Sequence, residues 1–173
     1  GFHRVDITHL SGFESESFDM VVRIGGAVSY VQDAYDDAVR GMLRLVRPDG
    51  ILLFGAMSLY GLLRVFTAGD SDNAIETLED HFDPAQLRNN PGHMLTQRGS
   101  PIIHMPLMLF TANYLRNYLD ALGCEVIGMA TANPLTVDGF ELAKITDNRS
   151  ATEWLLVASR KRSELQSMHH QAH

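Results

Sequence analysis

One stretch, residues 18–57, most constrains what this chain can fold into. It starts with a nearly all-apolar run at residues 20–24, passes through Gly25 and Gly26 into a helix-patterned segment, and ends in a tight turn and a second apolar run at residues 51–57. Strand, glycine loop, helix, turn and strand in this order predict one crossover unit of a parallel α/β sheet, with the first strand buried on both faces. Ligands of such sheets bind beyond the carboxyl ends of the strands, where glycines let the backbone approach closely.

Charge and apolar spacing mark the helix between these two strands. Asp33 stands where it can cap the helix, Asp36 and Asp37 fall in the first turn, and Arg44 lies near the end. This order of charges complements the helix dipole. The apolar residues recur at three- and four-residue steps, which predicts one buried face made of Tyr35, Ala38, Val39, Met42, Leu43 and Val46. Residues 48–50 then supply the turn.

The alternation of strand and helix stops between residues 58 and 110. Connections longer than about 15 residues are uncommon in compact domains, so we interpret this stretch as a helical insertion that covers one end of the sheet. The chain of 173 residues is long enough for one domain with a sizeable core. We therefore expect a single partial domain over residues 1–160, carrying the insertion, and a polar tail over residues 161–173.

Regular patterns return after the insertion. Thr111 stands where it can cap a helix, and Gly123 stands where it can close it. Residues 124–131 predict a strand, and a helical turn is expected around residues 140–145. Residues 153–159 predict the last strand, and the expected tail follows it.

Composition excludes several classes of function. A formal net charge of −7 argues against a nucleic-acid binder, which needs a basic surface. No apolar run approaches the 18 residues of a membrane span. The single cysteine, Cys124, rules out an internal disulfide and fits a reducing cytosol, so we expect a cytoplasmic protein. The spacing of histidines, cysteines and acids predicts no metal site.

Three segments taken together resemble the class I S-adenosylmethionine-dependent methyltransferases. They are Val5-Asp6-Ile7 with Leu10 four residues after the aspartate, Ser17-Phe-Asp-Met-Val-Val22, and Leu43-Arg-Leu-Val-Arg-Pro-Asp-Gly-Ile-Leu-Leu53. The first lies in residues 2–7, which predict the end of a strand. The chain resembles the C-terminal two-thirds of such an enzyme. The resemblance implies a Rossmann-like α/β sheet that is incomplete at its N-terminal side, mainly parallel, with an antiparallel last strand.

The resemblance also implies which residues bind the cofactor, S-adenosylmethionine. Asp6 matches the acid that accepts a hydrogen bond from the adenine amino group, and Ile7 matches the neighbour that packs on the adenine ring. The methionine part is matched by the strand end and loop formed by Arg23, Ile24, Gly25 and Gly26. Each residue also has a plainer interpretation: Asp6 solvates its own turn, Arg23 forms a salt bridge at a strand end, and the glycines form a bend.

Candidate substrate contacts follow the glycine loop and lie inside the insertion, which would act as a lid that selects the substrate. Ser29 and Tyr30 could contact substrate or pack the following helix, and Met105 and Met108 could line a pocket or fill the core. His104, among apolar neighbours, is our candidate for a general base, although surface histidines are commoner.

The family's glycine-rich loop, and the acid that holds the ribose, have no counterpart in this sequence. We therefore expect the chain alone to bind S-adenosylmethionine weakly or not at all, and the activity to require missing N-terminal residues. The function predicted is methyl transfer to an oxygen or nitrogen of a small-molecule acceptor. The alternative is a non-catalytic methyltransferase-like module whose exposed sheet edge pairs with a second copy or with a missing N-terminal segment. A nicotinamide-dependent α/β enzyme is a third interpretation.

Overall fold

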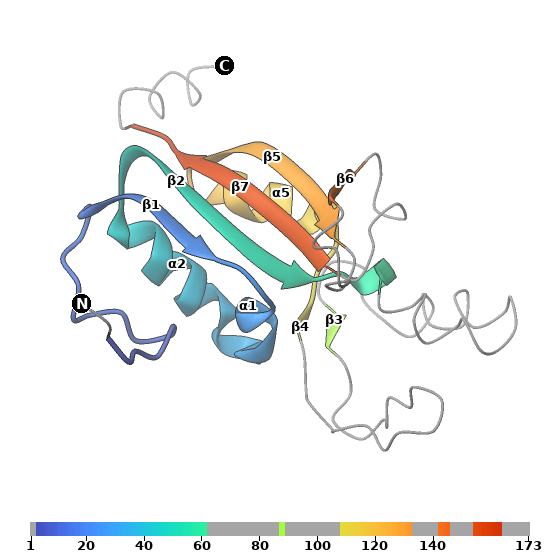
Figure 1. Cartoon of the computed structure of the whole chain (residues 1–173), viewed down its shortest axis with the longest axis horizontal. Coiled ribbons are helices and arrows are strands. Elements are labelled where there is room, and N and C mark those ends of the chain that lie inside the picture. The colour runs from blue at the N-terminus through green and yellow to red at the C-terminus, as the bar shows by residue number, and fades with distance from the viewer. Residues whose placement is uncertain (1–2, 62–86, 89–107, 133–141, 146–153, 164–173) are drawn as a thin grey trace, which may run out of the picture.

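The computed structural model describes residues 3–61, 87–88, 108–132, 142–145 and 154–163 (Figure 1). Its main element is a five-stranded sheet in the order β1-β2-β7-β5-β6. These strands are β1 (Phe18–Arg23), β2 (Val46–Met57), β7 (Trp154–Lys161), β5 (Cys124–Ala132) and β6 (Leu142–Lys144). A separate short ladder joins β3 (Leu87–Arg88) to β4 (Met108–Leu109).

The strand directions follow the prediction in part. β1 runs parallel to β2, and β7 lies antiparallel to both β2 and β5, which confirms the antiparallel last strand. β5 and β6 are also antiparallel. Among the described strands of this sheet, the parallel arrangement that was expected to dominate is therefore limited to the β1–β2 pair.

Two local predictions of secondary structure are wrong. Residues 142–144 form β6 rather than a helical turn, because their backbone pairs with residues 130–132 of β5; residues 140 and 141 lie outside the described part. Residues 3–7 are not a strand. They form a loop that turns where the His9 amide donates to the Asp6 carbonyl at 2.9 Å. A strand needs a neighbour for its backbone groups, and none of the described strands lies beside this segment.

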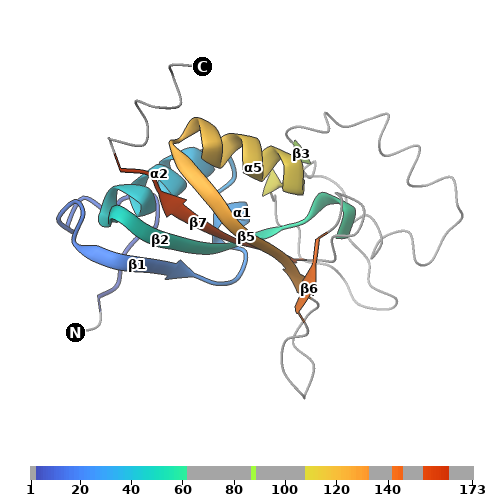
Figure 2. The same ribbon diagram turned by 90° about the horizontal axis from the view of Figure 1, so that it is seen from above.

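Three described helices cover one face of the sheet: α1 (Ala27–Tyr30), α2 (Tyr35–Leu45) and α5 (Ala112–Ala121) (Figure 2). The cap of α5 is confirmed, since the Thr111 hydroxyl oxygen accepts from the Tyr114 amide at 3.1 Å. The predicted cap at Asp33 is wrong. A 3-10 turn, η1 (Gln32–Ala34), takes that residue, so α2 starts later and its N-cap, Ala34, offers no side-chain oxygen.

The core lies between these helices and the sheet. The predicted stripe of α2 is confirmed for Tyr35, Ala38, Val39, Met42 and Leu43, which are all buried; its sixth member, Val46, is buried too but belongs to β2 and not to the helix. Alternate residues of β2 and β7 meet it, and α5 contributes two leucines; Leu52, Phe54, Leu155, Val157, Leu115 and Leu119 are each no more than 1% exposed. Burying one such side chain stabilises the fold by about 1.5–3 kcal/mol.

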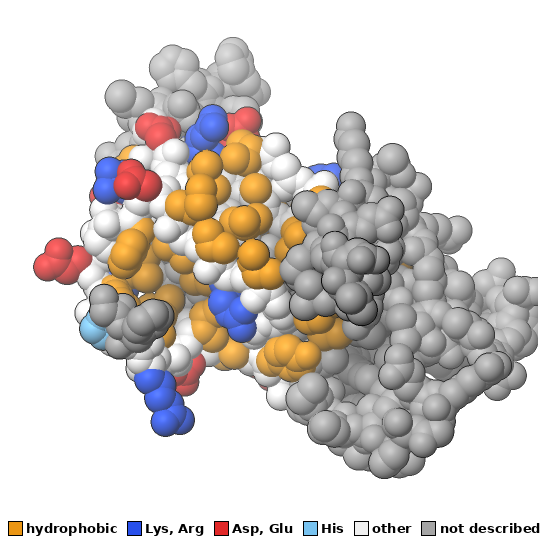
Figure 3. Space-filling model, viewed as in Figure 1, with side chains coloured by type: hydrophobic (Ala, Val, Ile, Leu, Met, Phe, Trp, Pro, Cys, Tyr) orange, Lys and Arg blue, Asp and Glu red, His pale blue; other side chains and the backbone are white. Residues whose placement is uncertain are grey.

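The opposite face of the sheet is apolar and open. On β1, Met20 and Val22 are 50% and 49% exposed, and Ile24 just beyond the strand is 49% exposed. Figure 3 shows hydrophobic side chains gathered on this face. The prediction that the first strand is buried on both faces is therefore wrong. Among the described strands β1 has one neighbour, β2, and the described helices all lie on the other side.

The predicted turn at residues 48–50 lies within β2, as an irregularity in its pairing with β1. Phe18 is opposite Val46 and Met20 opposite Ile51, so the four residues in between bulge out of the ladder. Asp49 takes a φ of 62° at this bulge. Gly50 lies so close to β1 that a Cβ there would be 2.8 Å from the Asp19 carbonyl oxygen, so a glycine is needed.

The predicted insertion, residues 58–110, lies largely outside the described residues. Its two described ends meet beside the end of β2. The Leu59 amide donates to the Phe110 carbonyl at 2.9 Å, and the Phe110 amide donates to the Met57 carbonyl at 3.0 Å. The chain thus leaves the sheet and returns to it at the same place. Of the predicted tail, Lys161 belongs to β7, and residues 164–173 lie outside the described part.

Candidate functional site

The carboxyl ends of the two parallel strands meet at a pair of glycines. Gly25, just after β1, has a φ of +90°, which residues with a side chain rarely adopt. Gly55 of β2 lies against it, because a Cβ on Gly55 would be 3.1 Å from both the amide nitrogen and the carbonyl oxygen of Gly25. The loop after β1 is therefore pressed against the backbone of β2. We call Gly25, Gly26 and Gly55 the glycine rim.

Gly26 is enclosed by two aromatic rings. A Cβ on this buried glycine would lie 2.9 Å from Cζ3 of Trp154 and 3.0 Å from Cε2 of Tyr30. Trp154, the first residue of β7, pairs with Met57 at the end of β2 and so lies beside the glycine rim. Trp154 is a rim residue that sequence reasoning missed. The one available signal was the position of the chain's only tryptophan at the start of the last strand.

Arg23 ends β1 beside the rim. Its guanidinium Nη1 donates to the carbonyl of Ile24, the next residue, and lies 3.4 Å from where a Cβ on Gly25 would be. Among the described residues it forms no ion pair. The predicted strand-end salt bridge is therefore not formed within the described part, and the arginine instead binds the backbone of the loop.

Asp6 holds the turn of the N-terminal loop. Its Oδ1 accepts from the Thr8 amide at 2.9 Å and from the Thr8 hydroxyl at 2.8 Å, and its Oδ2 lies 3.6 Å from Nδ1 of His9. The hydrogen bond from the Thr8 amide, followed by that from the hydroxyl, lowers the pKa of this exposed carboxyl below its usual value. Asp6 thus stays an ionised acceptor, which suits both interpretations given for it.

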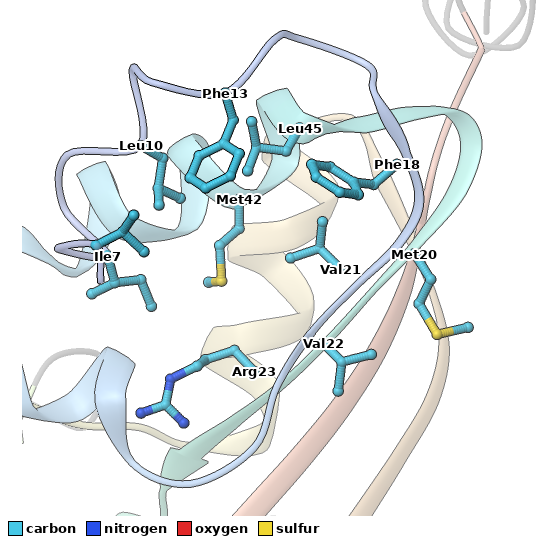
Figure 4. A pocket seen from close by; sticks show the side chains of 11 residues that line it. Ile7, Leu10, Phe13, Phe18, Met20, Val21, Val22, Arg23, Met42 and Leu45 are labelled. Carbon is cyan, nitrogen blue, oxygen red and sulfur yellow. The ribbon is translucent and has the colours of Figure 1, made fainter. Parts of the chain in front are cut away.

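An apolar pocket of about 360 Å³ lies between the N-terminal loop, β1 and α2 (Figure 4). Ile7, Leu10 and Phe13 from the loop face Val21 of β1 and Met42 of α2. Arg23 is the only charged residue in its lining. Of the predicted cofactor residues, the pocket brings Ile7 and Arg23 together, whereas Asp6, Ile24, Gly25 and Gly26 do not line it.

The predicted substrate residues are placed differently from one another. Ser29 is fully buried, and its hydroxyl oxygen accepts from the Met57 amide at 2.9 Å, so it ties α1 to β2 and is not open to a ligand. Met108 is 3% exposed and belongs to the core. Both expectations of substrate contact are therefore corrected to packing roles. Tyr30 is 41% exposed at the rim. His104 and Met105 lie outside the described residues.

Two kinds of feature are absent from the described part of the chain. No group of three or more metal-ligating side chains is found among its residues. None of its helices has the length and apolarity needed to cross a bilayer.

Comparison with known proteins finds the same fold in solved structures and a family model that matches the first third of the chain. Residues 1–54 match the model of a methyltransferase domain. No curated protein matches the chain. Among solved structures, a SAM-dependent methyltransferase from Methanosarcina mazei is 15% identical with a TM-score of 0.57, over 92% of this chain and 66% of that one. One from Thermotoga maritima, described as a possible histamine N-methyltransferase, is 14% identical with a TM-score of 0.54, over 90% and 61%.

A SAM-dependent methyltransferase from Mesorhizobium loti is similar to the same degree, with 16% identity and a TM-score of 0.50 over 91% of this chain and 68% of that one. The chain thus spans about two thirds of the length of these structures. It has the fold of the class I SAM-dependent methyltransferases, which confirms the fold that the resemblance implied. The cofactor of this class is S-adenosylmethionine.

Proposed function

We propose that this protein transfers a methyl group from S-adenosylmethionine to an oxygen or nitrogen of a small-molecule acceptor. The observation that carries the proposal is the glycine rim, where Gly25 and Gly55 bring two backbones together at the carboxyl ends of parallel strands. This is where α/β sheets of this class bind their ligands. The cofactor supplies an already activated methyl group, so the protein's task is mainly alignment.

The residues present fit the cofactor at two points. Asp6, ionised and more than half exposed, offers an acceptor for the adenine amino group, and Ile7 beside it offers an apolar surface for the ring. Arg23, Ile24, Gly25 and Gly26 supply the strand end and loop for the methionine part. Since Gly25 has no side chain, a ligand can approach its backbone closely.

The acceptor is proposed to be small because of charge. With a formal net charge of −7, the chain lacks the positive potential that holds a phosphate backbone. His104 and Met105, in the proposed lid, remain candidates for the general base and for a pocket wall. A base is needed only where the acceptor carries a proton at working pH.

Calorimetric titration of the intact polypeptide with S-adenosylhomocysteine tests the proposal, because the 173-residue chain alone is expected to bind the cofactor weakly or not at all. We expect binding, and about a tenfold to hundredfold loss of affinity in Asp6→Ala, since a hydrogen bond to a charged group contributes about 1.5–3 kcal/mol. The matched control is Glu14→Ala, an exposed acid on the same loop, which should change nothing. Absence of binding at millimolar ligand, or equal losses in both variants, would contradict the assignment.

We further propose that more polypeptide of the same protein completes the sheet beside β1. Three observations support this: β1 has one strand neighbour among the described residues, its outward side chains are about half exposed, and the chain spans 66% and 61% of two similar structures. Parallel sheets normally have both faces covered. The pocket beside β1 would receive side chains of the added segment.

Light scattering distinguishes this proposal, in which more of the same polypeptide lies beside β1, from one in which a second copy of the chain lies there. We expect the 173-residue chain to be monomeric and to bind a hydrophobic dye on its open face. A stable dimer that Met20→Lys dissociates would show instead that a second copy covers the edge, as expected for the non-catalytic module. Leu10→Lys, in the loop pocket, tests whether any effect is specific to the open face.

A further inference from the structure

Two aromatic side chains at the glycine rim have no role in the function proposed above. Tyr30 comes from α1 and Trp154 from the start of β7, 124 positions later in the chain. Their rings converge on Gly26, at 3.0 Å and 2.9 Å from the position a Cβ would take there. Any side chain at residue 26 would push one ring away. Gly26 is therefore a glycine because it admits both rings, and not only because it forms a bend.

The rings stand where a ligand of the sheet would reach them. Trp154 is opposite Met57, at the carboxyl end of β2, and Gly26 follows the loop that Gly55 contacts. Tyr30 is 41% exposed and Trp154 is partly exposed. The rings thus lie at the edge of the sheet where the cofactor is proposed to bind.

Both side chains also carry a polar group in addition to the ring. Within the described part of the chain, neither the Tyr30 hydroxyl nor the Trp154 indole N–H has a hydrogen-bond partner. Such groups usually find a partner when a ligand or protein covers them. Two aromatic rings that each carry a hydrogen-bond donor suit a planar ring with oxygen or nitrogen lone pairs.

We propose that Tyr30 and Trp154 form the acceptor-binding wall of this protein, and that the acceptor is a planar aromatic or heteroaromatic compound. The inference rests on the proposed methyl transfer and narrows its acceptor class. The rings bind and orient the acceptor by stacking and by donating hydrogen bonds to it. No charged group is required of the acceptor.

Because Trp154 is the only tryptophan, its fluorescence reports on this site alone. The probes are benzamide and cyclohexanecarboxamide, which share a neutral amide and differ in a flat or puckered ring. We expect benzamide to change the Trp154 emission saturably and to bind about threefold to tenfold more tightly than the saturated amide. Equal binding of the two amides, or no change in emission with either, overturns the inference.

Variants locate the effect. Tyr30→Leu should weaken benzamide binding by a similar factor, and Gly26→Ala should shift the Trp154 emission without ligand, because the added Cβ meets the ring. Tyr118→Phe, between α2 and α5, is the control and should leave both readouts unchanged. If Gly26→Ala fails to fold, as judged by circular dichroism, Tyr30→Leu alone decides; unchanged affinity in Tyr30→Leu overturns the wall. Calorimetry of the intact polypeptide with S-adenosylhomocysteine separates this outcome from failure of the methyl-transfer proposal.

Discussion

Neighbouring residues of β2 meet two different environments. Leu52 points to the helices and is fully buried, whereas Leu53, the next residue, faces the open side opposite Val22 and Ala158. The same strand sequence is apolar on both sides, yet the described chain supplies helices for one side only. The comparison shows that an apolar strand is suited to burial on both faces even where the described part of the chain covers only one of them.

The largest test of this comparison uses one substitution on each face. Leu52→Ala should lower the free energy of unfolding by about 2–5 kcal/mol, because it leaves a cavity in the core. Leu53→Ala removes the same atoms from the partly exposed face and should cost about 1 kcal/mol or less. Urea denaturation of both variants gives the two values. Equal costs would mean that the open face is packed as tightly as the core.

The covered side can be tested at its helix ends. Thr111→Ala removes the hydroxyl that accepts from the Tyr114 amide and should destabilise the protein by about 1 kcal/mol in the same denaturation assay. Thr111→Ser keeps the oxygen and should recover most of the loss. A serine variant as unstable as the alanine variant would show that packing of the methyl group, not capping, matters at this position.

The contact between α2 and α5 should make the stability of the fold depend on pH. The Tyr118 hydroxyl donates to Oδ1 of Asp36 at 2.7 Å, and Arg40 donates to Oδ2 at 2.7 Å. Partial burial raises the pKa of Asp36, but the two hydrogen bonds outweigh it, and the pKa lies below the usual 3.8. A carboxyl whose pKa is lower in the folded state than in the unfolded state stabilises the protein at any pH above the unfolded-state pKa. That stabilisation is lost as the pH falls through the folded-state pKa.

We therefore expect the free energy of unfolding to fall more steeply in the wild type than in Asp36→Asn between about pH 5 and pH 2. Urea denaturation at several pH values measures both slopes. Asp37→Asn, at an exposed neighbouring position, is the control and should follow the wild type. Identical slopes in wild type and Asp36→Asn would remove Asp36 from the acid response.

The smallest effect is expected on the open face. Met20→Lys should change the stability of this 173-residue chain by no more than about 0.5 kcal/mol, since the side chain is half exposed. The same variant should bind markedly less hydrophobic dye. A loss of stability comparable to that of Leu52→Ala would contradict the picture of an uncovered face.

The sequence predicted what local patterns decide. The α2 stripe, the Thr111 cap and the strand at residues 124–131 depend on spacing within about ten residues, and all three are found. Contacts across long separations could not be inferred this way. Trp154 reaches Gly26, and Tyr118 reaches Asp36, only because the sheet order and the packing of two helices bring them together.

The candidate site divides in the same manner. Gly25 and Arg23 follow from the end of an apolar run, and the structure places them at the end of β1. Ser29 and Met108 have side chains that serve packing and ligand contact equally well, so their sequence neighbours could not decide between the two roles. Burial decided it, since both are almost completely enclosed.

The closure beside β2 has a consequence for how this protein can change. Because the Phe110 backbone bonds to both Met57 and Leu59, the intervening segment starts and finishes at adjacent points on the scaffold. Its length and content can then be exchanged without moving the strands that carry the rim. We therefore expect insertions and deletions within this segment to leave the glycine rim in place.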